Sequence, residues 1–329
     1  MSLGGKAVLV TGAGGFIGSH LTAALVAAGA QVRALVHYNS RGDWGHLDAL
    51  EPGVRTAIDV ILGDVRDRTL VRKSVEGCQY VFHLAALIGI PYSYHAPQSY
   101  VETNILGTLN VLEACRDLGV ERLLQTSTSE VYGTAQYTPI DERHPLHAQS
   151  PYAASKIGAD QLAYSYYAAF GVPAVIVRPF NTFGPRQSAR AVIPTIITQA
   201  LGGGEIHLGS TRPVRDFLFV ADNARGFMAA AEAEGVCGEV INLGTGRGVA
   251  IGQLAELIGQ RLGRALVIRE DQQRQRPERS EVFELLCSAE KARQRLGWKP
   301  KFSLEEGLDQ TIAWVDAHRG EYRTDRYSI

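Results

Sequence analysis

Cysteine is scarce in this sequence, and its four residues are too widely separated to form a recognisable framework. They include no Cys-x-x-Cys pair and have no pair of histidines nearby. The sequence therefore predicts neither a disulfide scaffold nor a structural zinc site, and we expect no bound metal. Isolated cysteines of this kind are typical of a reducing compartment, so a cytoplasmic protein is expected.

An excess of charge and a long apolar run are also absent. The 33 basic side chains balance 34 acidic ones, for a formal net charge of −1, which gives no electrostatic basis for binding nucleic acid or an acidic membrane surface. No apolar stretch approaches the ~18 residues of a membrane-spanning helix. The beginning of the chain, MSLGGKAVLV, lacks the basic region and apolar core of a secretion signal. The charge balance does not exclude binding of small anionic ligands, because a few local arginines suffice to bind them.

Apolar residues make up 45% of the 329-residue chain, which is enough for a large core. In the first part of the chain, short apolar runs alternate with amphipathic helical patterns, as is typical of parallel strands covered by helices on both faces. We therefore predict an α/β, doubly wound sheet of the Rossmann type in residues 1–180. The alternation loosens in residues 181–329, where we expect a smaller, mixed α/β substrate-binding domain, with a strand near 239–243 returning to the main sheet.

A glycine-rich stretch, VLVTGAGGFIGSHL, follows the first predicted strand and opens a helix. Gly12 permits a tight turn, Gly15 lets the backbone approach a pyrophosphate, and Gly18 allows the helix to pack closely. The free N–H groups where the helix begins, around Phe16 and Ile17, provide positive potential for the phosphates. Glycines alone also occur in structural turns, but here a strand precedes them and a helix follows. Together these features predict a dinucleotide-binding site.

The end of the second predicted strand bears on the choice between NAD and NADP. NAD sites carry an acidic residue about 20 positions after the glycines, where it binds the ribose hydroxyls. Here that position falls on His37, and Asn39 and Arg41 follow it. These side chains suit a 2′-phosphate, so NADP is favoured, although NAD stays open and Arg41 could be an ordinary surface residue. Asp64 and Val65, after a later strand, are predicted to hold the adenine, unless Asp64 only caps a helix.

Hydroxyl and carboxylate side chains cluster where a later strand ends, in TSTSEVYG (126–133). One loop further on, SPYAASKIGADQ supplies Tyr152 and Lys156, which are four positions apart and therefore share one face of a helix. A lysine beside a tyrosine favours the phenolate, so Tyr152 is predicted to act as a base near neutral pH, with Lys156 also holding the nicotinamide ribose. The hydroxyl cluster either caps the next turn or faces a substrate.

These motifs together resemble the extended short-chain dehydrogenase/reductase superfamily, and the resemblance covers essentially the whole chain. Its other matching stretches are HLAA (83–86), TNILGTLNVL (103–112), RPFNTFGPRQ (178–187), RDFLFVAD (215–222) and LGWKP (296–300). The resemblance implies a nucleotide-sugar substrate and contacts of Leu84, Ala85 and Ala86 with the cofactor. It also implies a homodimer, in which the helices at 103–119 and 151–170 build a four-helix bundle between subunits.

Within this superfamily, the carboxylate of Glu130 favours a sugar-nucleotide 4,6-dehydratase. A 4-epimerase needs only a hydroxyl and a tyrosine to remove and return the C4 hydride, whereas a dehydratase must also abstract the C5 proton and expel the C6 hydroxyl. The stretch STSEVYG resembles GDP-mannose 4,6-dehydratases closely and dTDP-glucose 4,6-dehydratases less, since the latter have Asp in place of Ser129. We expect Thr128, Ser129 and Glu130 to be catalytic with Tyr152 and Lys156. A 4-epimerase and a dinucleotide-binding protein without catalysis stay as alternatives.

A narrower resemblance concerns the substrate. The stretches ALVHYNSRGDWG, FHLAALIGIPYSY and QSARAVIPTIITQALGG resemble nucleotide-linked N-acetylglucosamine 4,6-dehydratases of legionaminic-acid-type pathways. This implies UDP- or GDP-N-acetylglucosamine as substrate and a 4-keto-6-deoxy hexosamine as product. Asn181, Val192, Arg215 and Arg276 stand at superfamily positions that bind the sugar nucleotide, and the two guanidinium groups suit bidentate contacts with its diphosphate. Arg276 lies in a basic segment that could also be a solvated surface.

Overall fold

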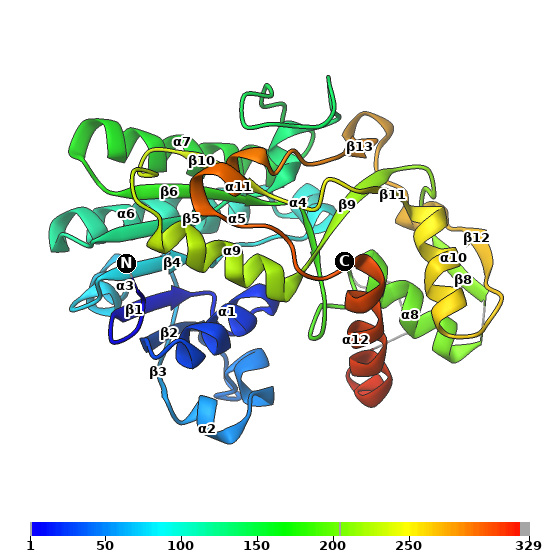
Figure 1. Ribbon diagram of the computed structural model, residues 1–329, viewed down its shortest axis with the longest axis horizontal. Coiled ribbons are helices and arrows are strands. Elements are labelled where there is room, and N and C mark those ends of the chain that lie inside the picture. Colours follow the sequence, from blue (N-terminus) through cyan, green and yellow to red (C-terminus); the bar gives the residue numbers. More distant parts are fainter. Residues whose placement is uncertain (1, 204, 323–329) are drawn as a thin grey trace.

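A parallel sheet forms the centre of the molecule in the computed structural model, which describes residues 2–203 and 205–322 (Figure 1). Within these residues the sheet has seven strands in the order β10-β6-β5-β4-β1-β2-β3, all paired in parallel. They are β1 (Ala7–Thr11), β2 (Gln31–His37), β3 (Ile58–Gly63), β4 (Tyr80–His83), β5 (Arg122–Thr126), β6 (Ala174–Pro179) and β10 (Val240–Leu243).

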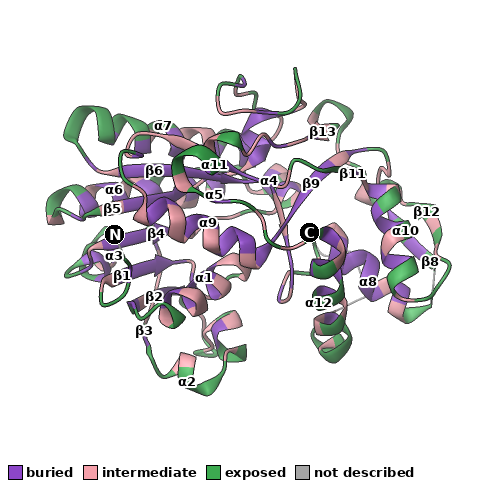
Figure 2. Cartoon of the chain, in the orientation of Figure 1, coloured by how far each residue is buried: buried purple, intermediate pink, exposed green. Residues whose placement is uncertain are grey.

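Helices cover both faces of this sheet because its strands are apolar on both sides. On one face, α1 (Phe16–Ala27) packs against α9 (Val220–Glu232), and both share a core with β1 and β2. On the other face, α3 (Arg68–Val75), α6 (Gly107–Leu118) and α7 (Pro151–Phe170) pack side by side. The strands between these layers are mostly buried (Figure 2). The predicted doubly wound sheet is thus confirmed.

A second, smaller group of elements lies at the other end of the molecule, on the right of Figure 1. Its strand β9 pairs with β7, β13 and β11, and β8 pairs with β12. The elements are β7 (Asn181–Phe183), α8 (Val192–Gly202), β8 (Glu205–Leu208), β9 (Val214–Phe219), β11 (Gly248–Ala250), α10 (Ile251–Arg261), β12 (Val267–Glu270), β13 (Glu284–Leu285) and α12 (Leu304–Ala317). Between β9 and β11 the chain returns to the main sheet through α9 and β10. The division into residues 1–180 and 181–329 stays a prediction.

Short helices connect these elements. They are η1 (Gly45–Ala49), α2 (Pro52–Arg55), α4 (Ile90–His95), α5 (Pro97–Tyr100), the π-helical η2 (Val101–Leu106), η3 (Ser129–Tyr132), η4 (Gln272–Arg274), η5 (Glu278–Ser280), α11 (Glu290–Leu296) and η6 (Arg319–Glu321). In the described part of the chain, no helix has both the length and the apolar character needed to cross a membrane.

The strand order reverses direction at β1, which has β4 on one side and β2 on the other. In open parallel sheets, the crevice at the carboxyl ends of the strands beside such a reversal is where ligands bind. Here the crevice receives the loops that follow β1, β2, β4 and β5, which carry most of the predicted site residues.

Candidate active site

The glycine-rich loop between β1 and α1 forms a cradle that leaves no room for side chains. Gly12 has a φ of +69°, and a Cβ there would lie 2.7 Å from the backbone nitrogen of Ala85. A Cβ at Gly18 would clash with the backbone of Gly12. Helix α1 begins at Phe16 without a side-chain cap, so its first N–H groups are free to bind an anion. The cradle therefore fits the pyrophosphate of a dinucleotide.

The first turn of α1 joins the two parts of the fold. Gly15 is the exposed N-cap residue of this helix. Phe16 and Ile17 are half-buried and pack against the apolar core of the second group of elements. The predicted pyrophosphate site is consequently held by both parts of the molecule.

The loop after β4 brings residues 84–86 to the same edge of the sheet. The backbone nitrogen of Ala85 donates to Thr11 Oγ1 at 3.2 Å. His83 is buried, with its ring nitrogens 2.7 Å from Thr11 Oγ1 and 3.1 Å from Thr108 Oγ1. Burial lowers the pKa of His83 to about 3, so the ring is neutral and serves to fix this loop. Sequence reasoning missed His83, although it stands in the HLAA motif.

Asp64 and Val65 lie where β3 ends, at the side of the crevice predicted to hold the adenine. Asp64 Oδ2 lies 2.6 Å from Arg66 Nη2, and the hydrogen bond from this guanidinium lowers the pKa of Asp64. The same oxygen is 3.7 Å from His37 Nε2, at the end of β2. Val65 is buried against α6, where a Cβ at Gly107 would lie 2.9 Å from its side chain. Asp64 thus binds neighbouring side chains, and the first N–H groups of α3 are capped by Asp67.

Asn39 and Arg41 lie together after β2, and both contact Asp43. Asn39 Nδ2 donates to Asp43 Oδ1 at 3.1 Å, and Arg41 Nε donates to Asp43 Oδ2 at 2.9 Å. The Arg41 side chain is 83% exposed, so this ion pair contributes little to stability. A ligand phosphate could therefore displace it at low cost. Asp43 is the first acidic residue after β2, and the sequence analysis gave it no role.

Tyr152 and Lys156 are buried on one face of α7, whose first turn is capped by Ser150. The hydroxyl groups of Tyr152 and Thr128 are hydrogen-bonded to each other. Lys156 Nζ donates to the backbone oxygen of Thr126, the last residue of β5. The fold therefore brings together three of the predicted catalytic side chains, from the end of β5 and the start of α7.

The protonation of this pair differs from the predicted phenolate. Burial is the largest influence and raises the pKa of Tyr152, against the opposing hydrogen bond from Thr128. Burial also lowers the pKa of Lys156 to about 8. In both side chains the loss of water favours the uncharged form. The protein's own groups consequently keep Tyr152 protonated at neutral pH.

Glu130 places a carboxylate next to this tyrosine, and its charge is one of the influences that raise the pKa of Tyr152. Glu130 is 8% exposed, and its Oε2 lies 3.8 Å from Arg276 Nη1. The same guanidinium nitrogen lies 3.9 Å from Glu281 Oε1, which is 3.5 Å from Arg215 Nη2. Two predicted substrate-binding arginines thus share a cluster with the predicted catalytic carboxylate. Glu281 joins them and was missed because nothing in its local sequence marks it.

The remaining predicted residues surround this cluster. Thr128 accepts a hydrogen bond from the backbone nitrogen of Glu130 at 3.2 Å, so it also caps η3. Ser129 is buried on that short helix. Asn181 begins β7, and its buried Oδ1 accepts no hydrogen bond within residues 2–203 and 205–322. Such an acceptor is costly unless a ligand donor satisfies it. Val192 is the first residue of α8 and is half-buried.

Aromatic side chains from α4 and α5 lie beside Tyr152. Tyr100 is buried, meets the Tyr152 ring edge-on at 6.2 Å, and donates its hydroxyl to the backbone oxygen of Gly89. Ile88 and Tyr92 remain exposed in the same segment. Leu87, Ile90 and Tyr94 pack in the same cluster as Tyr152, so this segment lies directly beside that tyrosine.

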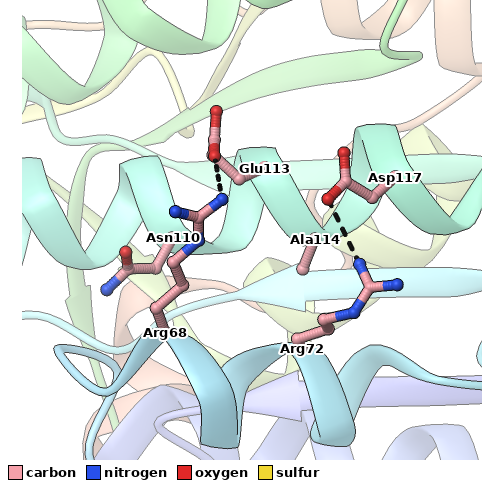
Figure 3. A pocket seen from close by; sticks show the side chains of 6 residues that line it. All are labelled: Arg68, Arg72, Asn110, Glu113, Ala114 and Asp117. Atoms are coloured by element: carbon pink, nitrogen blue, oxygen red, sulfur yellow. Dashed lines mark hydrogen bonds and ion pairs between the residues drawn. The ribbon is translucent and has the colours of Figure 1, made fainter.

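A depression on the outer surface, between α3 and α6, is also lined by charged side chains (Figure 3). Its volume is about 270 Å³. Arg68 pairs with Glu113 at 2.8 Å, and Arg72 pairs with Asp117 at 3.2 Å. These charges neutralise each other, and the depression lies between the covering helices α3 and α6. Its lining residue Asn110 donates to the backbone oxygen of Val65 at 3.0 Å and so holds the loop after β3.

Comparisons with known proteins agree over almost the whole chain. A family model described as GDP-mannose 4,6 dehydratase matches residues 9–311. A dTDP-glucose 4,6-dehydratase from Actinoplanes sp. is 33% identical over 318 residues, covering 95% of this chain and 98% of the relative.

Two solved structures are similar to the same extent but carry different activities in their descriptions. DesIV, a dTDP-glucose 4,6-dehydratase from Streptomyces venezuelae with NAD bound, has a TM-score of 0.85 at 30% identity, covering 96% of this chain and 99% of its own. A UDP-N-acetylglucosamine 4-epimerase from Methanobrevibacter ruminantium has a TM-score of 0.87 at 30% identity, covering 95% and 99%. Overall similarity therefore does not distinguish dehydration from epimerisation.

Proposed function

Since the chain belongs to the GDP-mannose 4,6-dehydratase family of NAD-dependent sugar-nucleotide dehydratases and epimerases, we propose that it is a 4,6-dehydratase. The reaction oxidises C4 of a nucleotide-linked hexose, removes water across C5 and C6, and returns the hydride to C6. The observation that carries the proposal is Glu130, a carboxylate buried beside Tyr152.

Burial of this carboxylate is difficult to explain as a structural device. Removing a carboxylate from water costs free energy unless charges and hydrogen bonds compensate. Within residues 2–203 and 205–322, the Glu130 side chain makes no hydrogen bond to a backbone N–H, and its closest cation, Arg276, is 3.8 Å away. The cap of η3 is Thr128. A role in chemistry at C5 and C6 accounts for Glu130 better than a role as a cap.

The first half of the reaction uses the hydroxyl pair and the lysine. Tyr152, hydrogen-bonded to Thr128, is positioned to remove the proton of the 4-hydroxyl. The positive charge of Lys156 stabilises the resulting phenolate from the same helix face. A dinucleotide whose pyrophosphate is held at the glycine cradle would supply an oxidised nicotinamide as the acceptor of the C4 hydride.

The second half uses the carboxylate. The C4 ketone makes the C5 proton acidic, so Glu130 can remove it and then give a proton to the C6 hydroxyl, which leaves as water. One residue performs both transfers because Ser129 stands where dTDP-glucose 4,6-dehydratases carry an aspartate. Arg215 and Arg276 are suited to hold the diphosphate, since guanidinium groups bind phosphates in bidentate geometry.

For the substrate, we propose UDP- or GDP-N-acetylglucosamine, on the resemblance of the segments around the nicotinamide and hexose. The test is incubation with nucleotide-linked glucose, mannose and N-acetylglucosamine, followed by mass spectrometry. A product lighter by one water is expected with an N-acetylglucosamine nucleotide. If only another hexose nucleotide were dehydrated, the proposed substrate would be wrong and the proposed reaction would stand.

The second candidate is a 4-epimerase, favoured by the similarity to a solved 4-epimerase. Both reactions use Tyr152 and Lys156, so these residues do not separate them. A product of unchanged mass with inverted C4 would establish the epimerase and leave the buried Glu130 unexplained. A protein that binds a dinucleotide but forms no product from any of these sugar nucleotides would favour the non-catalytic alternative.

The preference for NADP stays a prediction. It depends on Arg41, which would have to exchange Asp43 for a 2′-phosphate, whereas the similar structure of DesIV holds NAD. We expect the purified protein to release NADP or NADPH on denaturation, identified by mass spectrometry. An Arg41→Ala variant should then carry less NADP, while Arg55→Ala, at a half-buried arginine of α2, serves as a control. Release of NAD alone would contradict the 2′-phosphate argument and leave the dinucleotide site intact.

A homodimer is the assembly that we propose for this protein. Apolar side chains remain exposed on η2 and α7, among them Val101 at 47%, Leu106 at 47% and Tyr164 at 52%. Adjoining exposed apolar side chains favour association. We expect a dimer by light scattering at micromolar concentration, and a monomer for Val101→Glu. The matched control is Val267→Glu on β12, which is 50% exposed and should remain dimeric. A monomeric native protein would contradict this assembly.

A further inference from the structure

A buried ion pair lies directly behind the catalytic helix and has no part in the mechanism described so far. Asp160 of α7 and Arg178 of β6 are 1% and 3% exposed. Arg178 donates to Asp160 Oδ2 from Nη2 at 2.9 Å and from Nε at 3.1 Å. Ser127 Oγ donates to the same oxygen at 2.6 Å. The other oxygen, Oδ1, is buried and has no hydrogen-bond partner among the residues that the structure describes.

Asp160 stands on the same helix face as the catalytic pair. Tyr152, Lys156 and Asp160 follow one another at intervals of four residues, which aligns their side chains along α7. Lys156 is itself 4% exposed and donates to the backbone oxygen of Thr126. The carboxylate of Asp160 opposes the effect of burial on Lys156, whose pKa would otherwise be lower still.

Asp160 supplies the negative charge that acts on Lys156. The ionisable groups facing Lys156 are His83 from β4, Tyr152 and Asp160 from α7, and Arg178 behind Asp160 from β6. His83 is neutral and Tyr152 is protonated, as shown above. Since burial removes most of the solvation of an ammonium group, a fixed carboxylate one turn away is what can keep it charged.

Arg178 is held in turn by side chains from other elements. Its Nη1 donates to the hydroxyl of Tyr132 at 3.0 Å, and that hydroxyl donates to Asn242 Oδ1 of β10 at 2.8 Å. Ser127 and Tyr132 both belong to the TSTSEVYG stretch. Part of this hydroxyl cluster therefore faces the buried ion pair and not the substrate, since Ser127 bonds Asp160 directly and Tyr132 holds Arg178.

We propose that Asp160 is a positioning residue that keeps Lys156 charged and in place for the reaction, with Ser127 and Arg178 orienting the carboxylate. The importance of Lys156 in catalysis rests on the proposed function, but its protonation does not. The assignment can therefore be tested in the protein without any substrate.

The experiment follows the titration of Lys156 by nuclear magnetic resonance of isotopically labelled lysine side chains, assigned by the signal lost in Lys156→Met. In Asp160→Asn the midpoint should fall by about one pH unit, because a charge is removed at roughly one helical turn. Asp160→Glu should restore most of the shift. Ser127→Ala, which removes one neutral hydrogen bond from the same carboxylate, should move the midpoint much less.

A second variant guards against misfolding, because Asp160→Asn leaves Arg178 buried without its partner. The double variant Asp160→Asn/Arg178→Gln removes both charges and should still lower the midpoint, though less than the single change. In active protein, the alkaline limb of the single-turnover rate of C4 oxidation should move in the same direction. An unchanged Lys156 midpoint in the folded single or double variant would overturn the role of Asp160, whatever reaction the protein catalyses. A lowered midpoint without any turnover would support Asp160 and count against the proposed function.

Discussion

Replacing Tyr152 by phenylalanine is expected to lower both C4 oxidation and water loss by about 10²–10⁴-fold, the usual cost of losing a positioned base. The physical reason is that the hydroxyl of Tyr152, bonded to Thr128, is the group that we propose takes the 4-hydroxyl proton. Single-turnover absorbance of the reduced cofactor measures the first step, and mass spectrometry of the product measures the second.

The matched control for this change is Tyr164→Phe, on the same helix. Tyr164 is 52% exposed, so loss of its hydroxyl should leave both steps unchanged. A Tyr152→Phe protein that still reduces its cofactor at the native rate would contradict the assignment of the base. The identity of the base would then have to be sought elsewhere at the carboxyl edge of the sheet.

The main sheet and the dinucleotide cradle could be predicted because their signals are local. A buried parallel strand is a short apolar run, and the turn that follows β1 needs glycine for its own backbone conformation at Gly12. The sequence did not reveal the contact of Gly12 with Ala85. It did indicate the tight turn, whose backbone conformation requires glycine at this position. The same holds for Tyr152 and Lys156, whose spacing alone puts them on one helix face.

The charge networks could not be predicted, because their members come from distant parts of the chain. Asp160 meets Arg178 across the gap between α7 and β6, and Glu281 meets Arg215 and Arg276 only through the folding of the second group of elements. No local pattern distinguishes such residues from surface charges. The pKa of Tyr152 was misjudged for the same reason, since burial depends on the packing of the whole site.

The change with the next largest expected effect is Glu130→Gln. If Glu130 acts only after C4 has been oxidised, the variant should still transfer the C4 hydride and then stop before water is lost. The expected result is absorbance from reduced cofactor that rises on mixing with substrate and persists, with overall product formation lowered by about 10²–10⁴-fold. Because glutamine keeps the shape of the side chain, a loss of this size would reflect the missing proton transfer.

Glu281→Gln is the matched control for this result. Like Glu130, Glu281 lies beside Arg276, with 3.9 Å between Glu281 Oε1 and Arg276 Nη1, but it stands on the side of Arg215. Removing its charge disturbs the two arginines without touching the reacting carbons, so KM should rise while the reduced cofactor is reoxidised as in the native protein. If both variants show only a raised KM, Glu130 balances the charge of Arg276 and has no part in the chemistry. Near-normal dehydration by Glu130→Gln would have the same meaning. In either case the remaining machinery, Tyr152 with Thr128 and Lys156, is what a 4-epimerase needs, and that reaction would become the better reading of the site.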